Sequence, residues 1–302
     1  TLMFAFHPIQ TNVATYIIQR MTSMAALFYI ISATGYICFR MRTLPGTEKS
    51  GFVKYTSLSI SIIAGLFSFS SKENAAFLPI TILLIDFLFF YSLAGEYEKK
   101  KLRRIYAGSI FFLMLVFSYA GIKPLLSYIN GYGHRDFSLT ERLLTQPRIV
   151  FFYLFLLLIP NIGLLNLNQD ILISKSLSNP PHTIFAILGI GTLLIIAYRF
   201  RKRHNLLSFA ILWYLGNLVI ESTIIPLELV FEHRTYLPGV MVFSLLSLGI
   251  VYVSRNMVKR EKFILVTSLL LIAYGNGTFT RNFVFQTTLS MWHDVAQKSP
   301  NL

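Results

Sequence analysis

The chain has 302 residues, of which 54% are hydrophobic and only 13% are charged. A soluble domain usually carries about 25% charged residues, so this composition argues against a soluble globular protein. The formal net charge is +14, but the lysines and arginines cluster in short runs between apolar blocks. That distribution is typical of membrane topology signals, and no nucleic-acid partner is expected.

The apolar blocks predict membrane-spanning helices, each of which needs about 20 mostly apolar residues. In chain order they lie at residues 13–39, 56–71, 75–93, 105–121, 183–200, 206–226, 236–254 and 263–280. The expected fold class is therefore all-α: a polytopic transmembrane helix bundle of about eight spans. The single cysteine, Cys38, excludes an intrachain disulfide and a metal site built from cysteines.

Four connecting segments are rich in lysine and arginine, and they alternate correctly with the predicted spans. They are residues 40–55, 96–104, 199–204 and 255–262. Short loops of this kind stay in the cytoplasm. The remaining polar segments, including the C-terminal tail, are therefore expected on the opposite side of the membrane, which we call the outer side.

Residues 149–165 are apolar enough to suggest one more span, but a single extra crossing breaks this alternation. Pro160 favours a break within the segment, and irregular backbone at membrane depth needs protein or a wet cavity around it. We therefore predict that the segment is re-entrant or lies in the interface, within an outer region that begins with a long loop at 122–148.

The first polar motif lies before the first predicted span and contains His7 and Gln10 within residues 7–12. Arg20 follows about two turns into that apolar span. A charge at such depth normally faces a bundle interior or wet cavity, although an arginine can also snorkel to the interface. Arg20 is therefore a candidate for binding, with snorkelling or a structural ion pair as the alternative.

A second motif, residues 71–74, holds Lys72 and Glu73 between two apolar spans. It is either an ordinary solvated turn or a turn short enough to line a cavity below the headgroups. A third motif places Glu221 inside a predicted span, where a carboxylate needs a partner or a wet cavity. Glu228 lies a little further on, before the next motif.

The motif at residues 232–238 opens the next span with Glu232, His233 and Arg234. The helix macrodipole favours an acid such as Glu232 at this position and disfavours an arginine, so Arg234 is better explained by binding. Arg142, in the long outer region, is a further candidate. His7, His134 and His233 do not have the spacing of helical ligands, so no metal is expected.

These residues suit a ligand with one apolar end and one anionic end, such as a sugar linked to a polyprenyl phosphate. Arg20, Lys72, Arg142 or Arg234 are candidates to hold the phosphate as it leaves. A carboxylate is expected to act as general base on the acceptor hydroxyl, and direct displacement inverts the sugar carbon. No nucleotide cofactor is expected.

The motifs together resemble those of bacterial relatives of the transmembrane and tetratricopeptide-repeat protein O-mannosyltransferases, within the C-type glycosyltransferase superfamily. The resemblance is carried by residues 7–13, 19–21, 71–74, 220–226 and 231–238 and covers nearly the whole chain. It implies a sugar transferase with a lipid-linked donor and a protein or saccharide acceptor. The implied location is the bacterial inner membrane, with the active face and C-terminus in the periplasm.

The same resemblance implies a domain at residues 1–280 that lacks its first helices and first outer loop. The family's catalytic acid is expected in that loop, upstream of Thr1, so no catalytic residue is assigned in this chain. Residues 281–302 are expected to be an outer linker toward tetratricopeptide repeats. Family members often carry glutamate where this chain has Asn12, so a catalytic use of that position is not expected.

Two other functions remain open. A transporter or flippase for lipid-linked saccharides needs essential charges on both faces or at the midplane, and often has broken helices in symmetric halves. A non-catalytic membrane anchor for a repeat protein needs no acidic first outer loop.

Overall fold

The computed structural model describes residues 1–44, 51–93, 131–257 and 260–300, with isolated positions between 95 and 111. Regular structure in these segments is helical throughout, without strands, as the composition predicts. The predicted span at 105–121 falls largely outside the described residues, as do parts of three of the basic runs.

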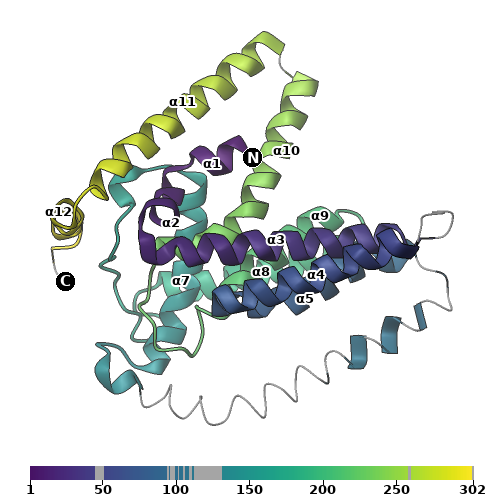
Figure 1. Cartoon of the computed structure of the whole chain (residues 1–302). Helices are drawn as coiled ribbons and strands as arrows, with labels where there is room; N and C mark the ends of the chain where they lie inside the picture. The colour runs from purple at the N-terminus through teal and green to yellow at the C-terminus, as the bar shows by residue number, and fades with distance from the viewer. Residues whose placement is uncertain are drawn as a thin grey trace.

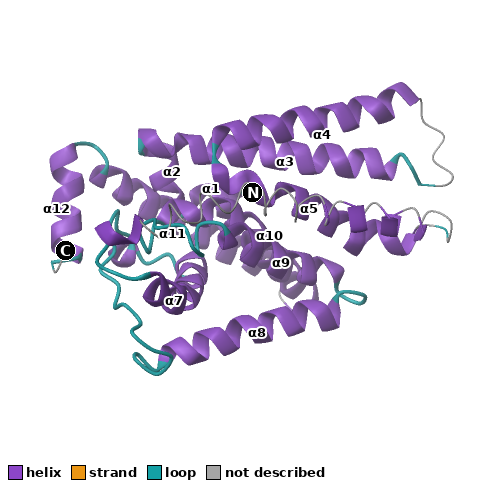
Figure 2. Cartoon of the chain, turned by 90° about the horizontal axis from the view of Figure 1, so that it is seen from below, coloured by secondary structure: helices purple, strands orange, loops and turns teal. Residues whose placement is uncertain are grey.

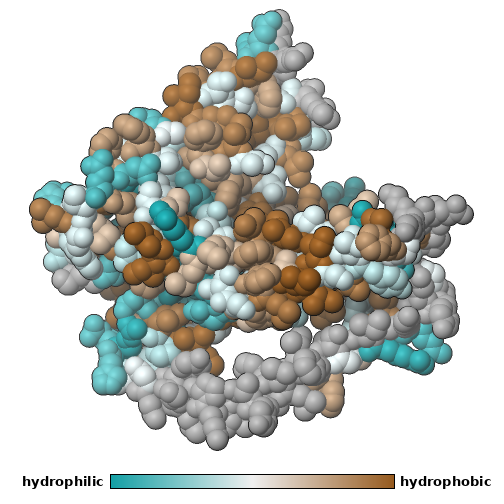
Figure 3. All heavy atoms as spheres, in the orientation of Figure 1, coloured by the Kyte–Doolittle hydropathy of each residue, from teal (hydrophilic) through white to brown (hydrophobic). Residues whose placement is uncertain are grey.

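Six helices in the described segments are long and apolar enough to cross a membrane. Five of them correspond to α3 (Arg20–Met41), α4 (Gly51–Ser71), α8 (His182–Phe200), α10 (Tyr236–Met257) and α11 (Arg260–Val284). The sixth runs from Glu73 through α5 (Leu78–Ile85) to Leu93. These helices indicate an integral membrane protein, although the count of about eight spans is not confirmed. Figure 3 shows apolar side chains over the visible faces of several of these helices.

Helices α3 and α4 form a hairpin that lies lengthwise in both Figure 1 and Figure 2. Small side chains bring their backbones together: the Ser32 hydroxyl donates to the carbonyl of Ser61 (2.7 Å), and the Ser68 hydroxyl donates to the carbonyl of Ala25 (2.8 Å). Small residues are characteristic of helix contacts in lipid, where burial of apolar area gives no advantage over contact with the acyl chains.

The bundle has two chemically different ends. We call the end where α3 begins and α4 finishes the signature end, and the opposite end, which carries Arg40 and residues 199–203, the basic end. At the basic end Arg40 forms an ion pair with the buried Asp86, and the Tyr106 hydroxyl donates to the same carboxylate at 2.5 Å. Asp86 therefore has the partner on another helix that a buried acid requires.

Helix α7 (Leu139–Leu158) crosses the bundle instead of joining it, standing upright in Figure 1 and end-on in Figure 2. It begins with a capping box in which Ser138 and Glu141 bond to each other's backbone amides. Helix therefore replaces the loop predicted for residues 139–148. This helix is not among those that are long and apolar enough to cross a membrane, and the re-entrant or interfacial placement of residues 149–165 stays a prediction.

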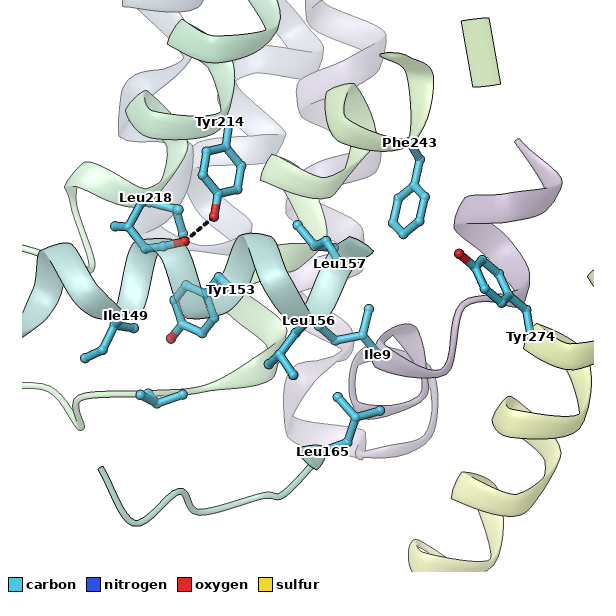
Figure 4. Close-up of a cluster of buried hydrophobic side chains, with 12 residues drawn as sticks. Ile9, Ile149, Tyr153, Leu156, Leu157, Leu165, Tyr214, Leu218, Phe243 and Tyr274 are labelled. Carbon is cyan, nitrogen blue, oxygen red and sulfur yellow. Dashed lines mark hydrogen bonds between the residues drawn. The ribbon is translucent and has the colours of Figure 1, made fainter. Parts of the chain in front are cut away.

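The inner face of α7 provides much of the largest buried apolar cluster, drawn in Figure 4. Tyr153, Leu156 and Leu157 of α7 meet Ile9 from the N-terminal segment and Phe243 of α10. The N-terminal segment comprises α1 (Leu2–Phe6), the short helical turn η1 (Pro8–Gln10) and α2 (Thr11–Thr15). Burial of this cluster fixes α7 against the N-terminal segment and α10, and so positions the signature end.

The C-terminal region, for which we predicted a linker, is helical and folds back on the domain. Helix α12 (Thr288–Lys298) follows α11 after a short turn. The ammonium of Lys298 donates to the carbonyls of Ile162 (3.2 Å) and Leu165 (2.8 Å), and the Ser299 hydroxyl accepts from the side chain of Asn166 (2.8 Å).

Candidate functional site

Glu221 lies just after a helix and not within one. The span predicted at 206–226 is shorter in the structure, because α9 (Asn205–Val219) is followed by an irregular turn. The turn frees the side chain of Glu221 to reach two other segments of the signature end, and it also leaves backbone carbonyls that need other donors.

The carboxylate of Glu221 lies between two cations. The ammonium of Lys72 lies 3.5 Å from one oxygen, and Nε of Arg234 lies 3.5 Å from the other. The exposed fractions of the three side chains are 7%, 3% and 1% for Lys72, Glu221 and Arg234. Three motifs that are distant in sequence therefore form one buried cluster of Lys72, Glu221 and Arg234, which we call the triad.

The position of Lys72 follows from the break between α4 and the short helical turn η3 (Glu73–Phe77). Its ammonium also donates to the hydroxyl of Thr22 at 3.0 Å. The ring of Phe77 packs so tightly on α9 that a Cβ added to Gly216 would lie 2.1 Å from it. A side chain at position 216 would push the Phe77 ring aside, so the glycine lets η3 pack in this way against α9. Lys72 immediately precedes η3.

Arg234 lies in the helical turn η8 (Glu232–Thr235), immediately before α10. One of its terminal nitrogens donates to the carbonyl of Leu229 at 3.0 Å, and its guanidinium lies over the ring of Phe231. Its Nε is buried without a hydrogen-bond partner among the described residues. The guanidinium is therefore not saturated by hydrogen bonds, although its Nε faces the carboxylate of Glu221 at 3.5 Å.

Arg142 supports the turn that carries Glu221. It is fully buried in α7 and donates to the carbonyls of Glu221 (2.7 Å), Thr223 (2.8 Å) and Leu227. Burial lowers the pKa of Arg142 to about 10, and the neighbouring charge of Arg234 adds to the effect. The side chain predicted to hold a phosphate is therefore committed to the protein backbone.

The triad and the neighbouring Arg142 together place three cations and one carboxylate in a buried region. Buried charge is costly unless it is paired, so an excess of positive charge favours the binding of an anion. His233 lies at the edge of this region, where its ring stacks on Phe231 at 5.1 Å and Lys72 and Arg234 are its charged neighbours.

A second buried network is balanced in charge, in contrast to the triad. Arg281 lies 3.6 Å from Glu232 and 2.7 Å from Asp294, and Lys298 lies 2.8 Å from Asp294. Two acids thus match two bases. Glu232 faces this network and not the triad, so neighbouring residues of η8 serve different clusters.

The remaining predicted residues are dispersed. His7 is buried between the rings of Phe243 and Tyr274, and burial lowers its pKa to about 4. Arg20 is exposed and is the first residue of α3. The helical backbone is interrupted at Tyr16, before this helix begins. The expected depth of Arg20 in an apolar span is therefore corrected.

Glu73 is exposed beside the buried Lys72. Gln10 is buried in η1, which contacts both η8 and α11. Neither amide atom of Gln10 has a partner among the described residues, and the same holds for the Asn12 side-chain oxygen. Such buried unpaired atoms require water or a ligand.

Sequence reasoning does not identify Arg281, Asp294 and Lys298, because residues 281–302 are expected to form a linker. The available signals were an arginine at the end of a predicted span and an amphipathic pattern over residues 288–298. Among the residues described by the structure, no group of three or more His, Cys, Asp or Glu side chains can hold a metal ion.

Comparison with protein-family models, curated proteins and solved structures finds no match for this chain.

Proposed function

We propose that the chain is a membrane glycosyltransferase domain that takes a sugar from a polyprenyl-phosphate-linked donor and transfers it to an acceptor hydroxyl. The main support is the buried excess of cations at one end of a bundle of membrane-length helices. A lipid-linked phosphate is anionic where it meets the membrane boundary and apolar beyond it, so it suits both features.

In this proposal Arg234 and Lys72 bind the donor phosphate. A guanidinium offers two parallel charged hydrogen bonds to phosphate, and an ammonium adds a point charge. Glu221 keeps the two cations in place before the donor arrives. Arg142 contributes indirectly, since it fixes the turn that carries Glu221.

The transfer step is a direct displacement. The acceptor oxygen forms a bond to the anomeric carbon while the bond from that carbon to the phosphate oxygen breaks, with inversion. The phosphate leaves with the electron pair, and its growing charge is stabilised by Arg234 and Lys72. The acceptor proton passes to a carboxylate base that remains unassigned here.

The unpaired amide atoms of Gln10 and the unpaired side-chain oxygen of Asn12 are suited to hydroxyl groups of the sugar, since they are buried and lack partners among the described residues. They belong to η1 and α2, which both contact η8. The proposed acceptor is a protein or saccharide on the outer side, and the proposed location is a bacterial inner membrane with the signature end toward the periplasm.

Two measurements test the proposal. Binding of undecaprenyl phosphate to the purified protein is compared for the wild type, Lys72→Gln and Arg234→Gln, and transfer is assayed with a panel of polyprenyl-phosphate sugars. We expect each substitution to weaken binding at least about tenfold and to lower transfer by about 100-fold or more. Lys202→Gln is the matched control, because Lys202 is exposed at the opposite, basic end of the bundle.

Undiminished binding in Lys72→Gln and Arg234→Gln contradicts the proposal. The two alternative functions give different results in the same system. A transporter moves the intact lipid-linked saccharide across proteoliposomes without cleaving it. A membrane anchor binds no polyprenyl phosphate at all.

A further inference from the structure

A groove of about 800 Å³ lies between α7 and α8, apart from the proposed transferase site. Aromatic side chains of α7 and the first turns of α8 line most of it. Two basic residues also line it: Arg148 of α7 and His182, the first residue of α8. The groove therefore combines an extensive apolar lining with a polar part.

Arg148 and Arg142 point in different directions from α7. Six residues along a helix turn the side chain by about 240°, so the two arginines cannot face the same ligand. Arg142 bonds to the turn after α9, whereas Arg148 donates from one terminal nitrogen to the carbonyl of Leu172 (2.8 Å) and the hydroxyl of Ser174 (3.0 Å). Its other two nitrogens have no partner among the described residues.

The apolar part of the groove is shaped by close packing of α7 on α8. A Cβ on Gly189 would lie 2.7 Å from the ring of Phe151, so this ring rests directly on the backbone of α8. Phe155 and Phe185 line the same groove and are 41% and 70% exposed. The groove is therefore open to the surroundings of α8, which are lipid for a membrane-spanning helix.

The depth of each part follows from α8. This helix is of membrane length and begins at His182, so His182 marks one membrane boundary. Arg148 is anchored to the segment just before α8, whereas Gly189 lies two turns further into the helix. The basic residues thus lie at headgroup level and the aromatic residues beside the acyl chains.

We propose that this groove binds one anionic glycerophospholipid of the surrounding bilayer. The phosphate contacts the free guanidinium nitrogens of Arg148 and the imidazole of His182, and one acyl chain lies along Phe155 and Phe185. Charge complementarity favours an anionic lipid over a zwitterionic one. The lipid would secure α7 against α8 and so support the helix that carries Arg142.

Native mass spectrometry of the intact chain tests this proposal. The protein is released from mixed micelles that contain equal amounts of phosphatidylglycerol and phosphatidylcholine. We expect one phosphatidylglycerol to remain bound to the wild type, and His182→Gln and Arg148→Gln to lower its retention at least about fivefold. The matched control is Lys175→Gln, which removes an exposed cation that does not line the groove.

Arg148→Gln also removes bonds to Leu172 and Ser174, so His182→Gln provides a test that does not disturb them. A photoreactive phosphatidylglycerol locates the lipid, and cross-links are expected on peptides that contain Phe155 or Phe185. Equal retention of phosphatidylcholine, or unchanged retention in both variants, overturns the proposal. So does preferential capture of undecaprenyl phosphate at these peptides, which assigns the groove to the donor.

Discussion

At the scale of single residues, Arg142 shows how one side chain can hold an irregular turn together. Its guanidinium replaces the donors that the carbonyls of Glu221, Thr223 and Leu227 lose when α9 ends. A buried acceptor left unpaired costs roughly 1–3 kcal/mol. We therefore expect Arg142→Met to lower the free energy of unfolding by roughly 3 kcal/mol or more.

Denaturant unfolding in detergent measures this effect, with Arg135→Met as the control because Arg135 is partly exposed. An unchanged midpoint for Arg142→Met would show that water satisfies the carbonyls equally well.

His7 gives the second prediction at this scale. Burial lowers its pKa from 6.5 to about 4, so the folded protein binds the proton less readily than the unfolded chain does. The stability contributed by the neutral ring is complete above pH 6.5 and is lost as the pH falls toward 4. The loss amounts to at most about 3 kcal/mol.

The free energy of unfolding measured in detergent between pH 4 and 7 should therefore show a smaller pH dependence in His7→Phe than in the wild type. Identical slopes for the two proteins argue against a buried neutral histidine.

Individual residues also show what the sequence could and could not predict. Glu221 is costly inside a predicted apolar span, Arg234 is disfavoured by the macrodipole at a helix start, and Lys72 lies in an unusually short turn, and these three arguments identify them as candidates. The partners of Arg142 were not predictable, because they are backbone carbonyls of a turn that hydrophobicity had assigned to a helix. Hydrophobicity places Arg20 too deep, because the apolar run in the sequence continues through Tyr16. In the structure the helical backbone is interrupted at Tyr16, and α3 begins only at Arg20.

At the scale of secondary structure, hydrophobic length predicted most helices well but not how they end. The region 206–226 is apolar to its last residues, yet α9 stops at Val219 because tertiary bonds to Arg142 and the triad replace helical ones. Hydrophobicity divides the residues of α7 between a loop and an apolar segment, although Ser138 and Glu141 form a capping box that the sequence itself indicates.

The third prediction concerns α12, which Asp294 connects to the core. Asp294 pairs with both Arg281 and Lys298, and Arg281 is fully buried. Breaking a buried ion pair leaves an uncompensated charge and costs about 3–5 kcal/mol. We expect Asp294→Asn to detach α12, so that hydrogen exchange across residues 288–298 becomes at least about tenfold faster.

The exposed neighbour His293 supplies the control, His293→Gln, in which exchange should not change. If Asp294→Asn also exchanges at the wild-type rate, the helix is held by its apolar face and not by the ion pairs.

At the scale of the whole molecule, the charges are distributed by function along the bundle. The triad and the balanced network lie at the signature end, whereas Arg199, Arg201 and Lys202 lie at the basic end of α8. The alternation of basic runs in the sequence predicted this segregation. It also predicts that residues 149–165 do not complete a span, but it does not predict that α7 begins at Leu139 or how it lies against α3 and α4, because the alternation counts crossings and gives no helix direction.

The last prediction tests the crossing of α7 and the sidedness of both ends in one experiment. In a Cys38→Ala background, single cysteines replace Thr140 before the apolar part of α7, Asn161 after it, and Lys202 at the basic end; all three positions are exposed. Because α7 crosses the bundle instead of spanning it, a membrane-impermeant maleimide should label positions 140 and 161 from the same side of oriented vesicles. Position 202 should be labelled only from the other side. Labelling of positions 140 and 161 from opposite sides would make α7 a span, reverse every later helix and place Lys72 on the opposite face from Glu221 and Arg234, which contradicts the triad.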